Sequence, residues 1–362
     1  MNARERLTRY LHYREVDRPP FTQWQSIWPE TVDRWRAEGL PPGVNPYEYF
    51  DFDKTQRRTD EVIPLDLGPI PRFITRTLYE DARYRVYVDG NGVVCKELKG
   101  HTSVPLYMDY PVKTPEDWER MKKRFDAGDM RRYPNNWGEE LLEYYETVDH
   151  PVYLSLTGFY GQARRFMGAE GISVAFYKSP NMVHDMMDFW ADFVLSVCKD
   201  AVKEAKIDYA VIWEDMAYKN GPHISPRLFK EFMTPNYRKI TGFLNHHGID
   251  IIMVDSDGNH DILTPLWLEV GVNCPYPLEV NAGMDAAAMR KTYGKALRLI
   301  GNIDKRALAQ GPEAIDRELD RRLPLVEDGG YIPAVDHAVS ADISFQNYCY
   351  YVKQLKQRLH VE

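Results

Sequence analysis

The chain lacks the features that would assign it at once to a common class of protein. Its 362 residues include only four cysteines, Cys95, Cys198, Cys274 and Cys349, which lie far apart and form no CxxC pair. This spacing argues against a disulfide framework and a cysteine zinc knuckle, and it fits a reducing, cytoplasmic environment. No signal-peptide pattern and no run of about 18 apolar residues is present. We therefore expect neither a membrane span nor export by a standard signal.

Basic residues and nucleotide-binding motifs are also scarce. Lys and Arg number 46 against 54 Asp and Glu, which gives a formal net charge of −8. This balance argues against a nucleic-acid partner, because binding a phosphate backbone needs a concentrated basic face. The sequence has no GxxxxGK[ST] loop, no HExxH, no GxSxG elbow and no Gly-rich dinucleotide turn. The absence of these motifs argues against a nucleotide-dependent enzyme and against the common hydrolases.

Aromatic residues, in contrast, are plentiful. They make up 13% of the chain, with 24 Tyr and 8 Trp. One interpretation is a Tyr-rich core and interface, since aromatic side chains bury large areas. The alternative is a pocket for a flat ligand.

Short apolar runs alternate with helical patterns along most of the chain. Continuous apolar runs are typical of parallel strands that are covered on both faces. At this length, one domain spanning residues 1–362 is preferred over two. The pattern predicts a single (β/α)8 barrel of the TIM type. The predicted strands are residues 21–24, 152–157, 209–213, 251–254, 297–300 and 331–335.

Helices and one insertion fill the spaces between these strands. Thr114 is a suitable N-cap before Pro115, the apolar spacing over 182–202 predicts a long helix, and Pro312 begins another. Residues 73–99 break the pattern, because two β-rich runs flank the turn Asp-Gly-Asn-Gly. We expect an inserted antiparallel hairpin beside the barrel mouth.

Acidic and imidazole side chains follow the predicted strands repeatedly. In a parallel barrel such side chains meet at the C-terminal rim, where the active site lies. The repetition therefore predicts an enzyme. The clusters are Glu214 and Asp215, Asp255 and Asp257, Glu279, Asp304, and Asp336 with His337.

Glu214 is the first candidate for a role in the chemistry. A buried carboxylate has a raised pKa, so Glu214 could serve as a proton donor, a base or a hard metal ligand. The alternative is structural: Glu214 or Asp215 caps the next helix or pairs with Lys219.

Asp255 and Asp257 lie two positions apart, on one side of an extended chain. They could bind a metal, hold a cationic substrate or stabilise a developing positive charge. The sequence Asp-Gly-Asn after Ser256 is also ordinary turn chemistry, so a structural role stays open. His260 is expected to be a solvated or capping residue.

Asp336 and His337 end the last predicted strand. Neighbouring strand residues point to opposite faces, so only one of the two can enter the pocket directly, and we expect it to be His337. A buried histidine bonded to backbone is the alternative. Glu279 and Asp304 have weaker claims, and Asp304 could simply begin a helix.

Five segments, taken in order, carry a resemblance to a known family: residues 4–20, the turn Gly158-Phe159-Tyr160-Gly161, residues 255–258, residues 301–304 and residues 329–337. They resemble the uroporphyrinogen decarboxylase superfamily over nearly the whole chain. The resemblance implies an α/β barrel with its site at the C-terminal mouth, and often a homodimer. It also implies one of two activities: cofactor-free decarboxylation of porphyrinogens, or methyl transfer to or from a corrinoid protein, usually assisted by zinc.

The chain departs from both branches of this superfamily. Residues 23–28 stand where the decarboxylases carry an arginine-rich stretch, so a polyanionic porphyrinogen would lack its clamp. Asp255 and Asp257 stand where the zinc methyltransferases carry His-x-Cys, and His337 lies near the position of a further Cys. A sulfur-ligated zinc is therefore not expected. The remaining set, Glu214, Asp255, Asp257, Glu279 and His337, could form a harder site of oxygen and nitrogen ligands or a metal-free acid/base pocket.

The resemblance and the residues together favour the methyltransferase of a corrinoid-dependent demethylase system. A methyl group would pass from a methoxylated aromatic or a methylated amine to a corrinoid protein. The alternatives are a decarboxylase, which needs no cofactor, and a barrel that only binds a ligand. The expected catalytic residues are Glu214, Asp255 and His337, which could also hold zinc or another divalent metal. The expected substrate-binding residues are Trp24, Tyr160, Asp257, Glu279 and Tyr218.

Overall fold

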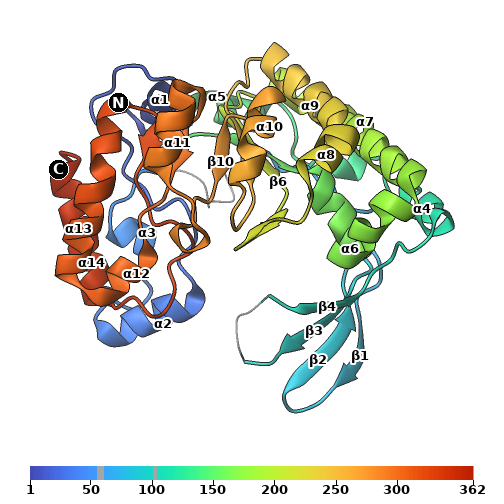
Figure 1. Ribbon diagram of the computed structural model, residues 1–362, viewed down its shortest axis with the longest axis horizontal. Helices are drawn as coiled ribbons and strands as arrows, with labels where there is room; N and C mark the ends of the chain where they lie inside the picture. Colours follow the sequence, from blue (N-terminus) through green and yellow to red (C-terminus); the bar gives the residue numbers. More distant parts are fainter. Residues whose placement is uncertain (55–60, 101–103, 362) are drawn as a thin grey trace.

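The computed structural model describes residues 1–54, 61–100 and 104–361 (Figure 1). It is an α/β protein in which parallel strands lie among helices, while one antiparallel sheet extends away from the rest. The strands are β1 (Arg76–Glu80), β2 (Tyr84–Val88), β3 (Val94–Leu98), β4 (Leu106–Asp109), β5 (Tyr153–Thr157), β6 (Tyr209–Trp213), β7 (Ala217–Tyr218), β8 (Gly221–Pro222), β9 (Ile252–Asp255), β10 (Cys274–Tyr276), β11 (Leu299–Ile300) and β12 (Tyr331–Ile332).

The helices lie mainly between consecutive parallel strands. Short 3-10 turns and one π-helical turn, Phe229–Met233, connect some of them. The α-helices are α1 (Ala3–Leu11), α2 (Pro29–Glu38), α3 (Pro46–Tyr49), α4 (Pro115–Lys122), α5 (Glu139–Thr147), α6 (Phe159–Lys178), α7 (Pro180–Glu204), α8 (Pro226–Leu228), α9 (Thr234–His246), α10 (Thr264–Glu269), α11 (Ala286–Tyr293), α12 (Lys305–Gln310), α13 (Pro312–Arg322) and α14 (Phe345–Arg358).

The parallel strands place their carboxyl ends side by side. β5, β6, β9 and β10 form one parallel sheet in the order β10-β9-β6-β5, and β11 pairs with β12. The register sets Trp213 beside Asp255 and Asp255 beside Tyr276. Isolated parallel bridges join Val62 to Tyr153 and Ile27 to Val339. These contacts align the strand ends along one edge.

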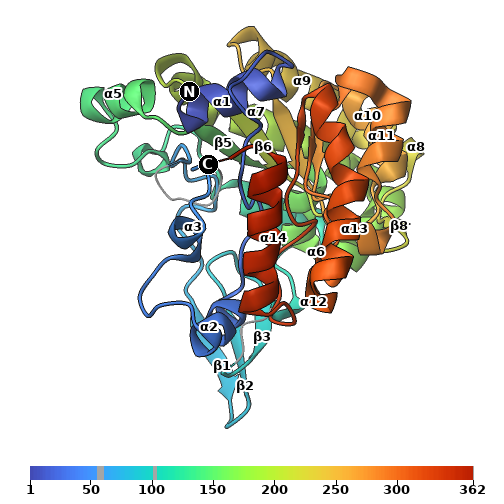
Figure 2. The ribbon, with the colours of Figure 1, turned by 90° about the vertical axis from the view of Figure 1, so that its left-hand side faces the viewer.

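Apolar side chains fill the space enclosed by the strands and α1. Tyr10 of α1, Trp24, Met253 and Ile332 belong to one buried cluster there. Larger clusters lie between the strands and the surrounding helices, α7 and α14 among them. Figure 2 shows α14 lying along the molecule beside α13 and α12.

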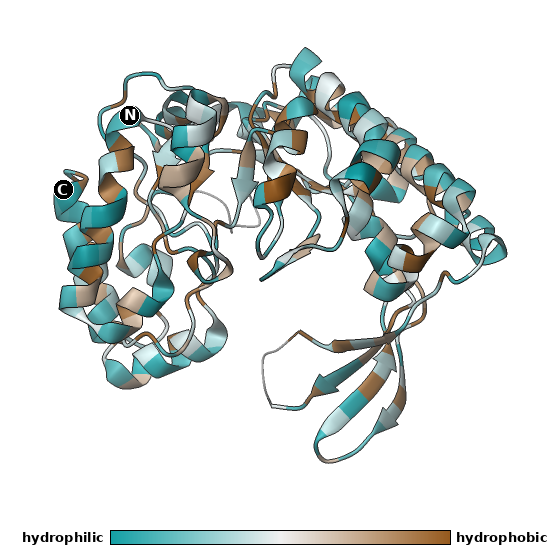
Figure 3. Cartoon of the chain, in the orientation of Figure 1, coloured by the Kyte–Doolittle hydropathy of each residue, from teal (hydrophilic) through white to brown (hydrophobic). Residues whose placement is uncertain are grey.

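The inserted sheet is larger than the expected hairpin. β2 and β3 pair across the predicted turn, and β1 and β4 extend the sheet to four antiparallel strands. Every residue of β1 and β4 is exposed. Figure 3 shows hydrophobic residues on this sheet although it stands away from the main body, and Ile74 and Leu106 are 83% and 64% exposed.

Most predicted elements are confirmed, with one exception among the strands. Thr114 caps α4 in a full capping box, the long helix forms as α7, and α13 begins at Pro312. The predicted strand at residues 21–24 is not among the strands of the described residues: this segment lies in the core, and the nearest described bridge is at Ile27. None of the described helices has the length and hydropathy needed to cross a membrane.

Candidate functional site

A cavity of about 1000 Å³ lies between the strand ends and the inserted sheet. Thr157, Trp213 and Asp255, the last residues of β5, β6 and β9, line it from one side. Val93 and Tyr107 line it from the inserted sheet. The cavity therefore lies at the carboxyl ends of parallel strands, where α/β folds hold their ligands.

Three side chains at the rim form a candidate metal site. One ligand atom from each of Asp257, Glu279 and His337 can be chosen so that all lie within 4.8 Å of one another. The Nε2 atom of His337 lies 3.3 Å from Asp257 Oδ1 and 3.5 Å from Glu279 Oε1. Asp257 also lines the cavity. One imidazole and two carboxylates form a plausible ligand set for zinc or a harder divalent ion.

The three groups shift one another's pKa values. Burial lowers the pKa of His337, but its hydrogen bond to Asp257 and the charges of Asp257 and Glu279 outweigh burial, so the net shift is upward. Burial raises the pKa of Asp257, but the bond and charge of His337 turn its net shift downward. Burial, helped by Asp257, raises the pKa of Glu279. Both net shifts, upward for His337 and downward for Asp257, stabilise the ion pair between them.

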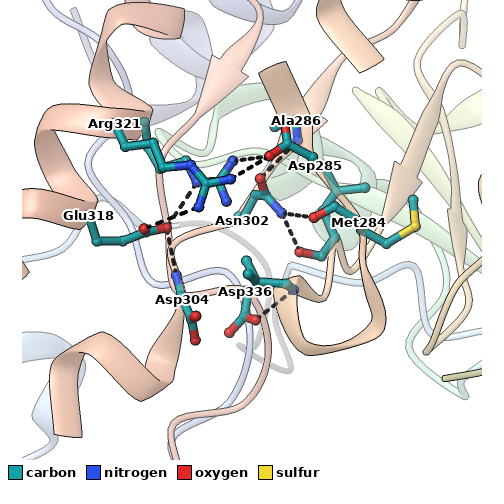
Figure 4. A network of polar contacts seen from close by, with 12 residues as sticks. Met284, Asp285, Ala286, Asn302, Asp304, Glu318, Arg321 and Asp336 are labelled. Atoms are coloured by element: carbon teal, nitrogen blue, oxygen red, sulfur yellow. Dashed lines mark hydrogen bonds and ion pairs between the residues drawn. The ribbon is translucent and has the colours of Figure 1, made fainter. Parts of the chain in front are cut away.

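Buried polar side chains hold the loop that carries Glu279. Asn302 donates to the carbonyls of Leu278 and Met284 and accepts from the N–H of Ala286. Asp336 accepts from the backbone N–H of Val280 at 2.9 Å (Figure 4). Asn302 and Asp336 follow the neighbouring parallel strands β11 and β12. Their hydrogen bonds therefore fix the position of the Glu279 loop against these strands.

The network in Figure 4 continues to the helices behind this loop. Arg322 binds both Glu318 and Asp285, and the backbone N–H of Asp304 donates to Glu318. Asp304 itself caps α12 through the N–H of Arg306. Asp304 therefore begins a helix, which confirms the structural role that the sequence left open for it.

Asp336 and His337 point in different directions. Asp336 is buried and its second oxygen accepts from the N–H of Lys305, whereas His337 faces Asp257 and Glu279. Both residues lie in a bend after the bridge at Val335, beyond the end of β12, so the turn of the chain and not the alternation of a strand separates their side chains.

The structure does not bring Glu214 and Asp255 into the His337 cluster as the expected metal site required. Glu214 is completely buried and accepts hydrogen bonds from the N–H groups of Phe159 and Gly161 and from the Tyr237 hydroxyl. It thus caps α6, and burial raises its pKa to about 7 despite these bonds. A Cβ on Gly158 would lie only 2.2 Å from the Glu214 carboxyl carbon, so glycine leaves room for the cap.

Asp255 lines the cavity but lies apart from the three-residue cluster. The Tyr276 hydroxyl donates to its Oδ2 at 3.4 Å, and the Asp255 carbonyl accepts from the N–H groups of Glu214 and Asp215. Asp257 comes closer to His337 because the chain turns after Ser256. Gly258 permits this turn: its φ is +84°, and a Cβ there would meet the Tyr218 backbone at 2.6 Å.

The aromatic residues expected to bind substrate lie elsewhere. Trp24 is buried beside Tyr209, with ring centres 6.0 Å apart, in the cluster enclosed by the strands. Tyr160 and Tyr218 both stack on His223, Tyr160 fully buried and Tyr218 half exposed. None of Trp24, Tyr160 and Tyr218 lines the cavity. His260, expected to be solvated or capping, is fully buried, and burial lowers its pKa to about 4.

Two consecutive arginines in the cavity wall escaped the sequence analysis. Arg164 binds the carboxylate and the carbonyl of Asp215. Arg165 stacks over Trp213, with its guanidinium carbon 4.2 Å from the ring centre. Both belong to the first two turns of α6, directly after β5. The sequence signal that could have identified them is their position just after a predicted strand.

A family model for uroporphyrinogen decarboxylase (URO-D) matches residues 138–358, which is more than half of the chain. The chain belongs to the uroporphyrinogen decarboxylase family. The matched region contains the candidate metal cluster, Glu214 and both arginines, whereas the inserted sheet precedes it.

One solved structure shows the same fold at low sequence identity, and a second is similar only in part. A methyltransferase from Methanosarcina mazei superposes with a TM-score of 0.64 at 16% identity, covering 99% of each chain. A B12-independent methionine synthase from Shewanella sp. W3-18-1, in complex with selenomethionine, gives a TM-score of only 0.28 at 11% identity over 95% of each chain. No curated protein sequence matches this chain.

Proposed function

We propose that this member of the uroporphyrinogen decarboxylase family is a methyltransferase. It would move a methyl group from a methoxylated aromatic or a methylated amine to a corrinoid carried by a partner protein. The cluster of Asp257, Glu279 and His337 at the edge of the cavity carries this proposal, since it offers an oxygen and nitrogen site where the chemistry would occur. Fold similarity to a methyltransferase over nearly the whole chain supports it.

The proposed fold is a closed (β/α)8 barrel in one domain. The parallel bridges Ile27 to Val339 and Val62 to Tyr153 support closure, because they connect the first and last parts of the chain to the parallel sheets. We also propose that the protein forms a homodimer and that it binds neither nucleic acid nor membranes.

The donor set fits a divalent metal. Two carboxylates and one imidazole leave coordination positions open for substrate or water, as in catalytic rather than structural metal sites. Asp257, Glu279 and His337 would hold the ion, with the Glu279 loop fixed by Asn302 and Asp336. A bound ion would act as a Lewis acid on the oxygen or nitrogen that loses its methyl group.

The chain's own residues can supply the remaining requirement, a proton for the leaving atom. The bond between the methyl carbon and its oxygen or nitrogen breaks, that atom keeps the electron pair, and the corrinoid receives the methyl group. Without an ion in the cluster, His337 could donate this proton, because Asp257 and Glu279 raise its pKa. With an ion bound, His337 would be a neutral ligand, and the Lewis acid would take the place of the proton.

Metal analysis and methyl transfer test the proposal together. Purified protein is assayed for bound zinc, iron, manganese and magnesium, then for methylation of cob(I)alamin by methoxylated aromatics and by methylamines. Transfer from one of these substrates that is lost in His337→Ala is the expected result. No transfer, together with carbon dioxide release from a porphyrinogen, would overturn it.

Decarboxylation is the second candidate. Arg72, Arg164 and Arg165 line the cavity, and convergent arginines favour an acidic substrate. Arg72 and Arg164 already form ion pairs with Asp66 and Asp215, however, which leaves less positive charge than a polyanionic porphyrinogen requires.

A further inference from the structure

Arg165 is a cation in the wall of the cavity. Its side chain is exposed there, and it forms no ion pair with any carboxylate in the described part of the chain. The neighbouring cavity arginines differ, because Arg72 lies 2.7 Å from Asp66 and Arg164 pairs with Asp215. Among these three arginines, Arg165 alone keeps its charge available for a ligand.

The guanidinium of Arg165 is already oriented. It stacks over Trp213 at 4.2 Å from the ring centre, and its Nη1 donates to Thr157 Oγ1 at 3.3 Å. A guanidinium carries five N–H donors in a planar fork that matches a carboxylate. Stacking on Trp213 holds this plane, so binding an anion costs less side-chain entropy than it would for a mobile arginine.

The walls around Arg165 suit a flat, mostly apolar ligand. Tyr107 and Tyr110 from the end of the inserted sheet and Val93 line the same cavity as Trp213. The charge of Arg165 and the Tyr107 hydroxyl are close enough to affect each other's pKa values. Aromatic side chains of this kind hold planar rings by stacking and edge contacts.

Carboxylates also line this cavity. Asp255, the strand neighbour of Trp213, and Asp257, a member of the His337 cluster, both lie in its wall. Burial lowers the pKa of Arg165, and the charge of Asp89, which lines the cavity as well, opposes this shift. A ligand that places one anion on Arg165 therefore meets these acids with the rest of its surface, where a second negative charge would be repelled.

We propose that Arg165, stacked on Trp213, binds the carboxylate of a planar aromatic monocarboxylic acid. The substrate is then a methylated aromatic acid, with the carboxylate on Arg165 and the methylated group toward Asp257 and His337, rather than a neutral ether or an amine. The identity of the reacting group rests on the proposed function, whereas the carboxylate subsite does not.

Calorimetric titration of the full chain with two matched probes tests the subsite. The probes are 4-methoxybenzoate and methoxybenzene, which differ only in the carboxylate. We expect the wild type to bind 4-methoxybenzoate at least about tenfold more tightly than methoxybenzene, as one charge-assisted pair implies. Arg165→Ala should lose this preference, whereas Arg165→Lys should keep part of it because it retains the charge but not the planar fork.

Arg227→Ala is the matched control, since Arg227 is exposed and pairs only with Glu231 on the protein surface. It should bind both probes as the wild type does, and thermal unfolding of each variant verifies the fold. Should Arg165→Ala fail to fold, Arg165→Lys and the wild-type preference between the two probes still decide the matter.

Three results would overturn the subsite: no binding of 4-methoxybenzoate, no preference over methoxybenzene, or unchanged preference in Arg165→Ala. These binding measurements need no corrinoid. If binding of the acid depends on Arg165 but no methyl transfer occurs, the subsite is supported and the proposed function is contradicted. If Arg165→Ala is fully active with neutral ethers, the proposed function is supported and the subsite is contradicted.

Discussion

At the scale of single residues, carboxylates with similar sequence surroundings perform different tasks. Glu214 and Glu279 both follow short apolar segments near strand ends. The Glu214 carboxylate is enclosed by the first turn of α6 and by Tyr237, whereas Glu279 is half-buried beside His337. Burial depth and hydrogen-bond donors therefore separate a structural cap from a candidate ligand.

The cap makes stability depend on pH through Glu214. Burial raises its pKa from 4.5 to about 7, so between these values the folded protein holds a proton that the unfolded chain releases. The resulting stabilisation is complete below pH 4.5 and is lost as the pH rises through 7. Relative to Glu214→Gln, the wild type should lose on the order of 3 kcal/mol of unfolding free energy between pH 4.5 and 8.

Urea unfolding of both proteins across this pH range measures the effect. Glu327→Gln is the control, because Glu327 is exposed and should show no such difference. A constant difference between wild type and Glu214→Gln at all pH values would show that Glu214 does not titrate in this range.

His337 supports a second prediction at this scale. Replacing it with Ala removes the imidazole from the cluster with Asp257 and Glu279. We expect affinity for a divalent metal to fall at least about tenfold, since even groups that only support a ligand contribute this much. Equilibrium dialysis followed by elemental analysis measures it. His246→Ala, at an exposed position on α9, should retain wild-type affinity; equal affinity in both variants would argue against metal binding at this cluster.

At the scale of elements, α6 connects the cavity wall to the inserted sheet. The helix bends at Gly168, where φ is +75° and ψ is 164°, a conformation open essentially only to glycine. The ring of Tyr110 packs against this bend, since a Cβ on Gly168 would lie 2.4 Å from Tyr110 Cε2. Tyr110 follows β4 directly, so the bend fixes how the sheet meets the cavity.

Gly168→Ala should therefore destabilise the protein by roughly 2–4 kcal/mol, through backbone strain and the clash with Tyr110. Chemical unfolding measures the change. Gly242→Ala is the matched control in α9: no atom lies within 4 Å of its Cβ position and it has no positive φ, so alanine should stabilise by up to about 1 kcal/mol. Equal effects of the two substitutions would contradict the role of the bend.

At the scale of the whole molecule, α1 joins parts of the chain that are distant in sequence. The Arg4 side chain lies 2.9 Å from Asp208 and donates to the carbonyls of Tyr145 and Lys206. The Tyr10 hydroxyl donates to the carbonyl of Tyr331 at 2.9 Å. The first helix therefore contacts segments that precede β6 and lie within β12.

Arg4→Ala should be among the most destabilising single changes to this chain. It leaves the largely buried Asp208 without its ionic partner, which typically costs about 3–5 kcal/mol. Urea unfolding should show a lower midpoint with an unchanged slope. Arg9→Ala, on the exposed side of the same helix, should change stability by less than about 1 kcal/mol; a comparable loss there would implicate the helix as a whole.

Local signals made much of the fold predictable. The apolar run at residues 209–213 coincides with β6, and Thr114 and Pro312 mark real helix starts. The outer strands β1 and β4 could not be predicted, because all their residues are exposed and carry no pattern of burial. The segment at 21–24 has the composition of a strand, but in the described structure it is a buried core segment outside the strands, so its composition reports burial rather than strand formation.

The site was predictable by residue type but not by grouping. Carboxylates and an imidazole at strand ends were expected, and Asp257, Glu279 and His337 do lie together. Which acids would meet depends on the turn at Gly258 and on the loop held by Asn302 and Asp336, contacts between residues far apart in sequence. Arg164 and Arg165 lie shortly after the end of β5, but that position alone does not show which side of α6 faces the cavity; the packing of the helix determines it.

The inserted sheet forms one wall of the cavity, while the parallel strands supply the candidate ligands. The candidate ligands and this wall of the cavity are thus encoded in different stretches of the gene, and the family model matches the former but not the latter. Under the proposed function, mutations between residues 73 and 110 should change which molecules bind while leaving the candidate ligands in place, so we expect divergence among relatives to concentrate there.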